Sequence, residues 1–384
     1  MANDIQRGVP ILHKEGFPRI DSLEEGAIVK LQNPSGKFIA KGYIGHQNKG
    51  LGWVLTKNEA EAIDTKFFER KIKAALEYRR DYFQNPDTTA FRVFNGEGDG
   101  IGGLTIDYFD GYYLISWYSE GIYSFKKMIL EALESSTEYK GIYEKKRFDT
   151  KGQYVEDDDF VSGERGEFPL IVKENGQSFA VYLNDGAMVG VFLDQRDVRK
   201  KIRDTYSKGK TVLNTFSYTG AFSVFAASGG AKKTTSVDLA KRSLSKTTEQ
   251  FEVNGIDPSQ QDIVVMDVFE YFKYAKRKEL SFDLVILDPP SFARSKKYTF
   301  SSSKDYTKLL KDAISLTNKN GVIVASTNNA TFGMKKFKSF VDKAFKDSNL
   351  RYEIEEEYSL PNDFKTSPLF KEGNYLKVLF IRVK

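Results

Sequence analysis

The sequence predicts an α/β protein whose main domain is a doubly wound, mostly parallel sheet of seven strands. Short apolar runs alternate with helical patterns from residue 211 onward, as expected for strand–helix–strand units. The first of these runs, Thr211–Leu213, leads through one tight turn into a helix of small residues. Right-handed crossovers bring successive strand ends to one edge of such a sheet, where ligands bind.

Three of the predicted strands finish on an acidic residue, namely Asp238, Asp267 and Asp288. Asp238 lies about 20 residues beyond the first turn, the distance at which an acid of a dinucleotide-binding unit takes the ribose hydroxyls. Each acid could instead cap the helix that follows it, which is a common use of Asp at such a junction. As an ordered set, the three acids favour a ligand that contains a nucleoside.

The turn after the first strand indicates the kind of cofactor. It carries one glycine, Gly220, where a dinucleotide-binding turn has three that allow close approach to a pyrophosphate. S-adenosylmethionine has no pyrophosphate, and its ribose and adenine amine suit Asp238 and Asp267, respectively. The residues expected at this cofactor are Asn214, Phe216, Ser217, Tyr218, Thr219, Gly220, Asp238, Leu239, Asp267 and Val268.

Asp288 opens the stretch Asp288-Pro289-Pro290-Ser291-Phe292. Proline has no N–H and a fixed φ, so Pro289 and Pro290 predict a stiff corner whose carbonyls can accept hydrogen bonds from an exocyclic amine. Asp288 can accept another from the same base, and Phe292 can stack on that base for about 1–3 kcal/mol. The alternative is an ordinary turn that ends a strand. The candidate catalytic residues are Asp288, Pro289, Pro290 and Phe292.

Together these motifs resemble a known family. The turn at 216–220, the segment Phe-Leu-Asp-Gln-Arg-Asp-Val-Arg at 192–199, the glycine-rich segment 95–107 and the Asp-Pro-Pro-Ser-Phe stretch are similar to bacterial large-subunit (23S) rRNA methyltransferases of the methyltransferase I type. The resemblance spans nearly the whole chain. It implies a Rossmann-like class I methyltransferase domain, S-adenosylmethionine as cofactor and RNA as substrate. It also implies that Gln195 and Arg196 lie at the cofactor pocket, although by themselves they are typical of a solvated basic helix.

The chain departs from that family in having no cysteine. Methylation of cytosine carbon 5, the activity of the typical member, requires a thiolate that adds to the ring. Ser326-Thr327-Asn328-Asn329 stands where that nucleophile would follow a strand. Residues 288–297 also look like the guanine-N7 half of a fused large-subunit rRNA enzyme, so a purine nitrogen is the favoured target. A non-catalytic RNA- or ribosome-binding protein and an NAD-dependent dehydrogenase are the alternatives.

The net charge is only +5, but basic clusters follow strand ends at the predicted active edge. Such side chains can neutralise phosphates, although charge runs are often just solvated helix faces. The residues expected to bind RNA are Arg199, Lys200, Arg294, Lys296, Lys297, Lys335 and Lys336.

Composition also limits the other partners. The absence of cysteine excludes disulfides and thiolate metal sites, and we expect no metal. No apolar run reaches the ~18 residues of a membrane span. We therefore expect a soluble, cytoplasmic protein without a membrane partner, and the sequence leaves open whether it forms a homodimer.

Three further parts precede the methyltransferase domain, which is expected over 186–384. Residues 1–70 alternate as strands and resemble the PUA module, a small RNA-binding β-barrel, with Tyr43 and Trp53 expected in its core. A charged helix is predicted over 65–83, and residues 71–87 read as a helical linker.

Residues 88–185 read as a central α+β domain of the EEHEE type. Asp110-Gly111 and Asn175-Gly176 predict two hairpin turns within it. Near the end of the chain, the stretch 361–371 separates two late strands and is long enough to reach the pocket. Its Phe364 and Phe370 are expected to pack rather than to stack on a base.

Overall fold

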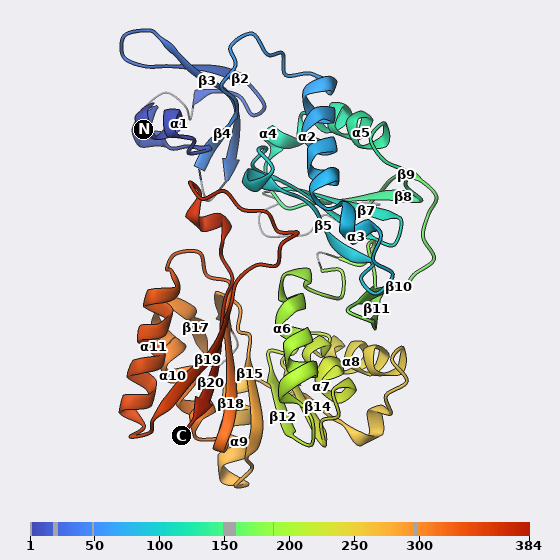
Figure 1. The fold of residues 1–384 in the computed structure, drawn as a ribbon, viewed down its shortest axis with the longest axis vertical. Helices are drawn as coiled ribbons and strands as arrows, with labels where there is room; N and C mark the ends of the chain where they lie inside the picture. Colours follow the sequence, from blue (N-terminus) through green and yellow to red (C-terminus); the bar gives the residue numbers. More distant parts are fainter. Residues whose placement is uncertain (1, 18–21, 48–49, 149–158, 187, 295–297) are drawn as a thin grey trace. The chain divides into compact units, whose positions relative to one another are not determined.

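The computed structural model describes residues 2–17, 22–47, 50–148, 159–186, 188–294 and 298–384. The chain forms two compact units, and Figure 1 traces their elements in order. Unit 1 contains Met1–Lys173, Val181–Val189 and Asn362–Gly373, and unit 2 contains Glu174–Ala180, Gly190–Pro361 and Asn374–Lys384.

Unit 1 begins with a four-stranded sheet in the order β1-β4-β3-β2. The turn between β2 and β3 forms because Asn33 Oδ1 accepts hydrogen bonds from the N–H groups of Ser35 and Lys37 at 3.0 and 2.9 Å. Tyr43 and Trp53 are fully buried and stacked at 6.0 Å, so their expected place in the core is confirmed. The elements are α1 (Ala2–Arg7), β1 (Ile11–Leu12), η1 (Lys14–Gly16), β2 (Ile28–Gln32), β3 (Phe38–Gln47) and β4 (Gly50–Thr56).

A five-stranded sheet, β5-β6-β7-β8-β9, follows in unit 1, with β7 and β8 parallel and the other pairs antiparallel. The hairpin at Asp110-Gly111 is confirmed: both residues have positive φ, 49° and 98°, as a two-residue turn of this kind requires. The elements are α2 (Thr65–Tyr78), α3 (Arg80–Phe83), β5 (Ala90–Asn95), η3 (Gly96–Gly98), β6 (Leu104–Phe109), β7 (Tyr112–Trp117), α4 (Glu120–Tyr123), α5 (Lys126–Glu134), β8 (Gly141–Lys146) and β9 (Phe160–Gly163).

The helix predicted over 65–83 is broken at Arg79, which has φ −107° and ψ 16°. Its buried guanidinium donates to both carboxylate oxygens of Asp99 at 2.8 Å and to the carbonyl of Asp363. On the other side of α2, Phe68 and Ile72 pack into the core of unit 1. The helix is therefore part of that core.

The long connection between the last two strands also belongs to unit 1 over Asn362–Gly373. Asp363 is fully buried and accepts the main-chain N–H of Arg92 at 2.8 Å. Phe364 and Phe370 are each 3% exposed, which confirms that they pack. The stretch that the sequence suggested could reach the pocket is thus bound within unit 1.

Unit 2 is built on a seven-stranded sheet in the order β14-β13-β12-β15-β18-β20-β19. The first five strands are parallel, and β20 is antiparallel to both its neighbours, so the sheet is mixed. Its strands are β12 (Thr211–Thr215), β13 (Lys233–Asp238), β14 (Asp262–Val265), β15 (Phe282–Leu287), β18 (Thr317–Thr327), β19 (Tyr352–Tyr358) and β20 (Lys377–Val383).

Two short hairpins are separate from these sheets, β10 (Leu170–Glu174) with β11 (Gln177–Val181) and β16 (Phe292–Arg294) with β17 (Thr299–Ser301). Residues 170–173 and 181 of the first hairpin belong to unit 1, and the second hairpin lies in unit 2. Asn175 and Gly176 make the predicted turn, with φ 48° and 82°. The remaining elements are η4 (Leu193–Gln195), α6 (Arg196–Lys201), η5 (Ile202–Tyr206), α7 (Ala221–Ser228), α8 (Arg242–Glu252), η6 (Pro258–Gln260), α9 (Val268–Arg277), α10 (Ser302–Ile314), α11 (Met334–Asp347) and η7 (Lys371–Gly373), the last of which lies in unit 1.

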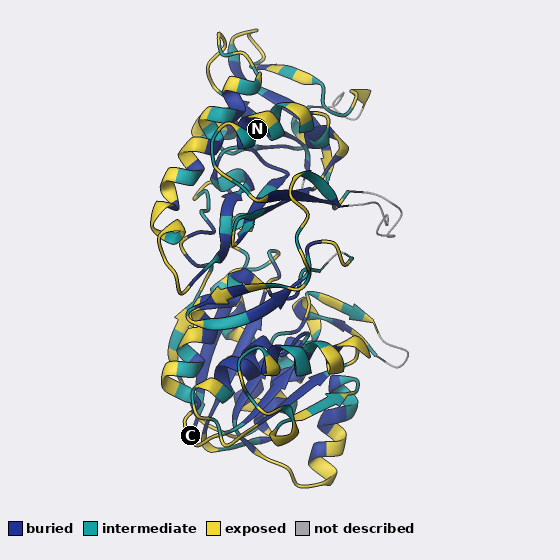
Figure 2. Ribbon diagram, turned by 90° about the vertical axis from the view of Figure 1, so that its right-hand side faces the viewer, coloured by how far each residue is buried: buried dark blue, intermediate teal, exposed yellow. Residues whose placement is uncertain are grey.

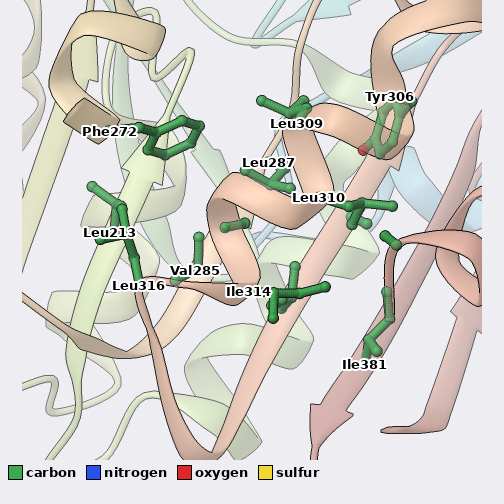
Figure 3. Packing of buried hydrophobic residues seen from close by; sticks show 14 of the residues in the cluster. Leu213, Phe272, Val285, Leu287, Tyr306, Leu309, Leu310, Ile314, Leu316 and Ile381 are labelled. Carbon is green, nitrogen blue, oxygen red and sulfur yellow. The ribbon is translucent and has the colours of Figure 1, made fainter. Parts of the chain in front are cut away.

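Both faces of the sheet in unit 2 are buried. Consecutive residues of β12 point to opposite sides, so Val212 joins a cluster with helices α6 and α7 whereas Leu213 joins a cluster with α9, α10 and α11. Figure 3 shows the second cluster from close by, and Figure 2 shows the buried strands between helices whose outer faces are exposed. Apolar runs without alternation, which predicted these strands, are typical of sheets covered on both faces.

Candidate functional site

The three acids predicted at one edge of the sheet lie at the carboxyl ends of strands in unit 2. Asp238 ends β13, Asp267 comes two residues after β14, and Asp288 directly follows β15. These strands, with β12 between β13 and β15, are parallel neighbours, so their carboxyl ends share an edge. The open end of such a sheet is where a parallel α/β fold binds its ligand.

Asp238 holds the turn after β12. Its Oδ2 accepts the N–H of Tyr218 at 2.9 Å and its Oδ1 accepts that of Ala240 at 2.8 Å. The turn needs the glycine at its end, because Gly220 has φ +79° and a Cβ there would lie 2.4 Å from Thr247 Cγ2. The backbone of this turn therefore requires the single glycine that the sequence shows there.

The other residues of the turn are fixed to the segment that precedes α6. Thr219 Oγ1 donates to the carbonyl of Gly190 at 2.6 Å, and the N–H of Gly190 donates to the Tyr218 hydroxyl at 3.0 Å. The rings of Tyr218 and Phe192 are 5.3 Å apart. The turn therefore lies against residues 190–192, directly before Gln195.

Ser217 and Phe216 face different surroundings within the same turn. Ser217 is buried, and its N–H donates to the carbonyl of Val237 at 3.1 Å. Phe216 lies 6.4 Å, between ring centroids, from both Phe269 and Phe300.

Asp267, which follows β14, caps the next helix, which was the alternative to a cofactor contact. Its Oδ1 accepts the N–H groups of Phe269 and Glu270 at the start of α9. The side chain of Val268 is 3% exposed and packs in the core. Leu239, by contrast, is 54% exposed directly after Asp238.

Asp288 is held by Gln195. The Nε2 group of Gln195 donates to Asp288 Oδ1 at 3.0 Å and to Ser326 Oγ at 2.7 Å. Burial, and after it the charge of Asp194, raises the pKa of Asp288 from 3.8 to about 6. Hydrogen bonds from Ser326 and Gln195 and the charge of Arg199 act in the opposite direction. Asp288 is therefore a carboxylate at neutral pH that becomes a neutral acid under mildly acidic conditions.

The corner after Asp288 presents one aromatic ring to solvent. Pro289 is buried, Pro290 is exposed, and Phe292 is 62% exposed at the start of β16. Ser291 Oγ donates to Asn328 Oδ1 at 2.7 Å, which ties the corner to the end of β18. Phe292 is thus available for contact with a planar ligand.

Sequence reasoning missed several residues that hold this corner. Tyr306 is fully buried, and its hydroxyl donates to the carbonyl of Ser326 at 2.6 Å. Tyr375 donates to Asp194 Oδ2 at 2.8 Å, beside Gln195. These partners are far apart in the sequence, and no local pattern marks them.

The position of Arg199 shows that its predicted role in RNA binding is wrong. It was expected on the surface, binding RNA, but it is 2% exposed and donates to both oxygens of Glu174 at 2.7 and 2.8 Å and to the carbonyl of Phe192 at 2.6 Å. The buried carboxylate of Glu174, at the end of β10, therefore pairs with this guanidinium. Gln195 and Arg196 are likewise buried, 4% and 2% exposed, so the solvated-helix interpretation of that turn is wrong.

The other cations expected at RNA lie on the surface of unit 2. Lys200, Arg294, Lys335 and Lys336 are exposed, and Lys336 Nζ lies 5.3 Å from the centroid of the Phe340 ring. Lys296 and Lys297 lie outside the described residues.

The site is rich in acceptors, which suits S-adenosylmethionine with its ammonium, ribose hydroxyl and adenine amine donors. Among the described atoms, Gln195 Oε1 and Asn214 Oδ1 are buried acceptors without a protein partner. Asn214 uses its Nδ2 to donate to Ser223 Oγ at 3.0 Å, so its oxygen remains for another donor. Asp238 and Asp267 add carboxylates at the same edge, and the residues present therefore fit this cofactor.

Other ligand classes have less support. Within the described ranges, no group of three or more His, Cys, Asp or Glu side chains could hold a metal ion. No helix in the same ranges is long and apolar enough to cross a membrane.

The mixed seven-stranded sheet with acids at its open end defines a Rossmann-like methyltransferase fold. Residues 91–364 match the family model described as S-adenosylmethionine-dependent methyltransferase, and residues 1–57 match a PUA-like domain. The chain belongs to the S-adenosylmethionine-dependent methyltransferase family and uses that cofactor. This membership removes the dehydrogenase alternative.

Two curated relatives cover almost the whole chain. The protein of Bacillus subtilis (strain 168) named "Putative ribosomal RNA large subunit methyltransferase YwbD" is 62% identical over 386 residues, covering 100% of this chain and 98% of its own. The "Ribosomal RNA large subunit methyltransferase I" of Aeromonas salmonicida (strain A449) is 30% identical, covering 98% of this chain and 95% of its own.

Two solved structures are similar over the whole length. SMU.776, described as "a putative methyltransferase complexed with SAH", is 39% identical with a TM-score of 0.92, covering 99% of this chain and 97% of that one. A protein from Streptococcus mutans described as "a putative sam-dependent methyltransferase" is 38% identical with a TM-score of 0.91, covering 100% and 97%.

Proposed function

We propose that this protein transfers a methyl group from S-adenosylmethionine to a base of large-subunit ribosomal RNA. The observation that carries the proposal is the corner at Asp288-Pro289-Pro290, which lies at the same sheet edge as the cofactor turn and leads to the exposed ring of Phe292. The names of the relatives at 62% and 30% identity support ribosomal RNA as the substrate.

Each residue of the corner has a distinct role in this proposal. Asp288 and the proline carbonyls accept hydrogen bonds from the base, and Phe292 stacks on its face. Gln195 fixes the Asp288 carboxylate through Nε2. When bound, S-adenosylmethionine supplies a sulfonium methyl group, which forms a bond to the base as the carbon–sulfur bond breaks and sulfur keeps the electron pair.

The favoured target is a purine nitrogen. A ring nitrogen with a lone pair needs orientation and no covalent adduct, whereas carbon 5 of cytosine needs a thiolate and the chain has no cysteine. Ser326 offers only a hydroxyl, which already contacts Gln195 Nε2 at 2.7 Å. No histidine follows residue 46, so no imidazole base is available in unit 2 to activate that hydroxyl.

The cofactor is held, in this proposal, by the turn 214–220, Asp238, Leu239 and Asp267, with Gln195 and Arg196 beneath it. Main-chain atoms of Val268 complete the set. Lys200, Arg294, Lys335 and Lys336 contact RNA, and Lys296 and Lys297 remain predictions. We divide the chain into a PUA-like domain at 1–70, a helical linker at 71–87, a central domain at 88–185 and the methyltransferase domain at 186–384.

The test uses purified full-length protein, methyl-labelled S-adenosylmethionine and large-subunit rRNA transcribed in vitro. We expect label in the RNA with the wild type, none with Asp288→Ala, and S-adenosylmethionine affinity within about threefold of wild type in that variant by calorimetry. Asp81→Ala, at a side chain 94% exposed in unit 1, is the matched control and should transfer label normally. Label transfer by Asp288→Ala at the wild-type rate would remove Asp288 from the mechanism.

A further inference from the structure

Helix α10 divides its residues between the core and solvent. Tyr306, Leu309 and Leu310 point into the core of unit 2 (Figure 3). Lys304 and Lys308 are exposed and lie four residues apart, so they project from the same outer face of the helix. Neither lysine stood out in the sequence.

The first turn of α10 is fastened to the catalytic corner. The N–H of Ser302 donates to the carbonyl of Ser291 at 3.0 Å, and Asn329 Nδ2 donates to Ser302 Oγ at 2.8 Å. Lys304 is two residues from that junction. The lysine face of α10 therefore begins directly beside the Asp-Pro-Pro-Ser stretch.

Two further cations lie at the same place. The rings of Tyr306 and Phe337 meet edge to face at 4.9 Å, so α10 and α11 start side by side, and exposed Lys335 is two residues before Phe337 (Figure 1). Arg294 ends β16, which pairs with β17, and β17 runs directly into α10. We call Arg294, Lys304, Lys308 and Lys335 the α10 rim.

The α10 rim keeps its positive charge among the residues that the structure describes. Among the described residues, no carboxylate or other side chain pairs with these four cations. Further along the same two helices, Lys311 pairs with Asp347 at 3.3 Å and Lys338 with Glu357, whereas Lys343 and Lys346 are exposed and no described side chain pairs with them. The one acid in the first turn of α10, Asp305, accepts the N–H of Ser301. The edge that carries the corner thus presents four cations that no described side chain neutralises.

We propose that the α10 rim binds the phosphodiester backbone of the RNA next to the nucleotide held at Asp288, with Lys304 and Lys308 as phosphate contacts. The inference rests on the proposed function and adds the surface by which the substrate is held. Lysines that neutralise phosphates release condensed counterions, so each contact adds affinity and salt dependence. The exposed ring of Phe292 lies at the start of the same β16–β17 hairpin, where it can stack on a base of that strand.

The test is fluorescence anisotropy of labelled in vitro transcribed large-subunit rRNA with full-length protein between 50 and 300 mM salt. For single-stranded contacts the binding slope falls by about 0.7 per phosphate contact removed. Lys304→Ala/Lys308→Ala should therefore lower the slope by about 1.4 and weaken binding about 25-fold at 0.1 M salt. Its affinity for S-adenosylmethionine, measured by calorimetry, should equal that of the wild type.

The matched control is Lys343→Ala/Lys346→Ala, which removes two exposed lysines from the later part of α11. The control should bind RNA within about twofold of the wild type. Equal losses in both double variants would mean a general charge effect and would overturn the α10 rim, as would no loss in either. Absence of RNA binding by the wild type would instead overturn the proposed function. Binding to an acidic protein but not to RNA would overturn both.

Discussion

The raised pKa of Asp288 makes methyl transfer depend on pH. Burial and the charge of Asp194 raise that pKa to about 6, and the proposed mechanism needs the ionised carboxylate as an acceptor. The ionised fraction of such a group is about 0.9 at pH 7 and about 0.1 at pH 5. We therefore expect the single-turnover rate to rise about tenfold between pH 5 and 7 and to level off above pH 7.

The assay is single-turnover methylation of rRNA with protein and S-adenosylmethionine saturating at every pH, which removes binding effects. Asp194→Asn should shift the midpoint below 6, because it deletes the second largest cause of the raised pKa. Asp288→Asn should give a slow rate that does not change over this range. A wild-type profile that is flat from pH 5 to 7, or a midpoint unmoved by Asp194→Asn, would contradict the reasoning.

Three further predictions concern stability. Arg199→Met should cost about 3–5 kcal/mol by urea unfolding because it leaves Glu174 buried and unpaired, whereas Arg199→Met/Glu174→Leu should recover most of this loss; equal losses would contradict the pairing. Burial lowers the pKa of Lys377 from 10.5 to about 8, so the unfolded chain binds the proton more tightly and stability should rise between pH 8 and 10.5. Lys377→Met should remove roughly 3 kcal/mol of that rise, and an unchanged pH dependence would exclude Lys377 as its source. Gly220→Ala should cost more than about 1 kcal/mol and weaken cofactor binding in calorimetry, whereas Gly333→Ala, where a Cβ meets nothing within 4 Å, should leave cofactor binding unchanged.

The sequence predicted the sheet and the acids at its edge because both depend on local patterns. The apolar run that ends on Asp288 and the β-branched stretch that ends on Asp238 mark strand and strand end together, and the single glycine at 220 matches a backbone that only glycine enters without strain. The hairpin turns at Asp110 and Asn175 were predictable for the same reason, since two adjacent residues decide them.

The sequence could not predict which charged residues would be buried. The charges around Arg199 have the spacing of a solvated basic helix. Its burial depends on Glu174, which lies 25 residues earlier in the β10–β11 hairpin. The contact of Gln195 with Ser326 joins positions 131 residues apart. The buried guanidinium of Arg79 has a hydrogen-bond partner in the carbonyl of Asp363, 284 residues away. Each of these features is decided by a tertiary partner, and no window of the sequence contains both members.

The reaction itself provides the most direct test of the account. Large-subunit rRNA methylated in vitro by the purified protein can be digested to nucleosides and separated by liquid chromatography with mass spectrometry. We expect the new methyl group on a purine, bonded to nitrogen. Appearance of 5-methylcytidine as the product would contradict the account, because it would require ring activation by a chain that has no thiol.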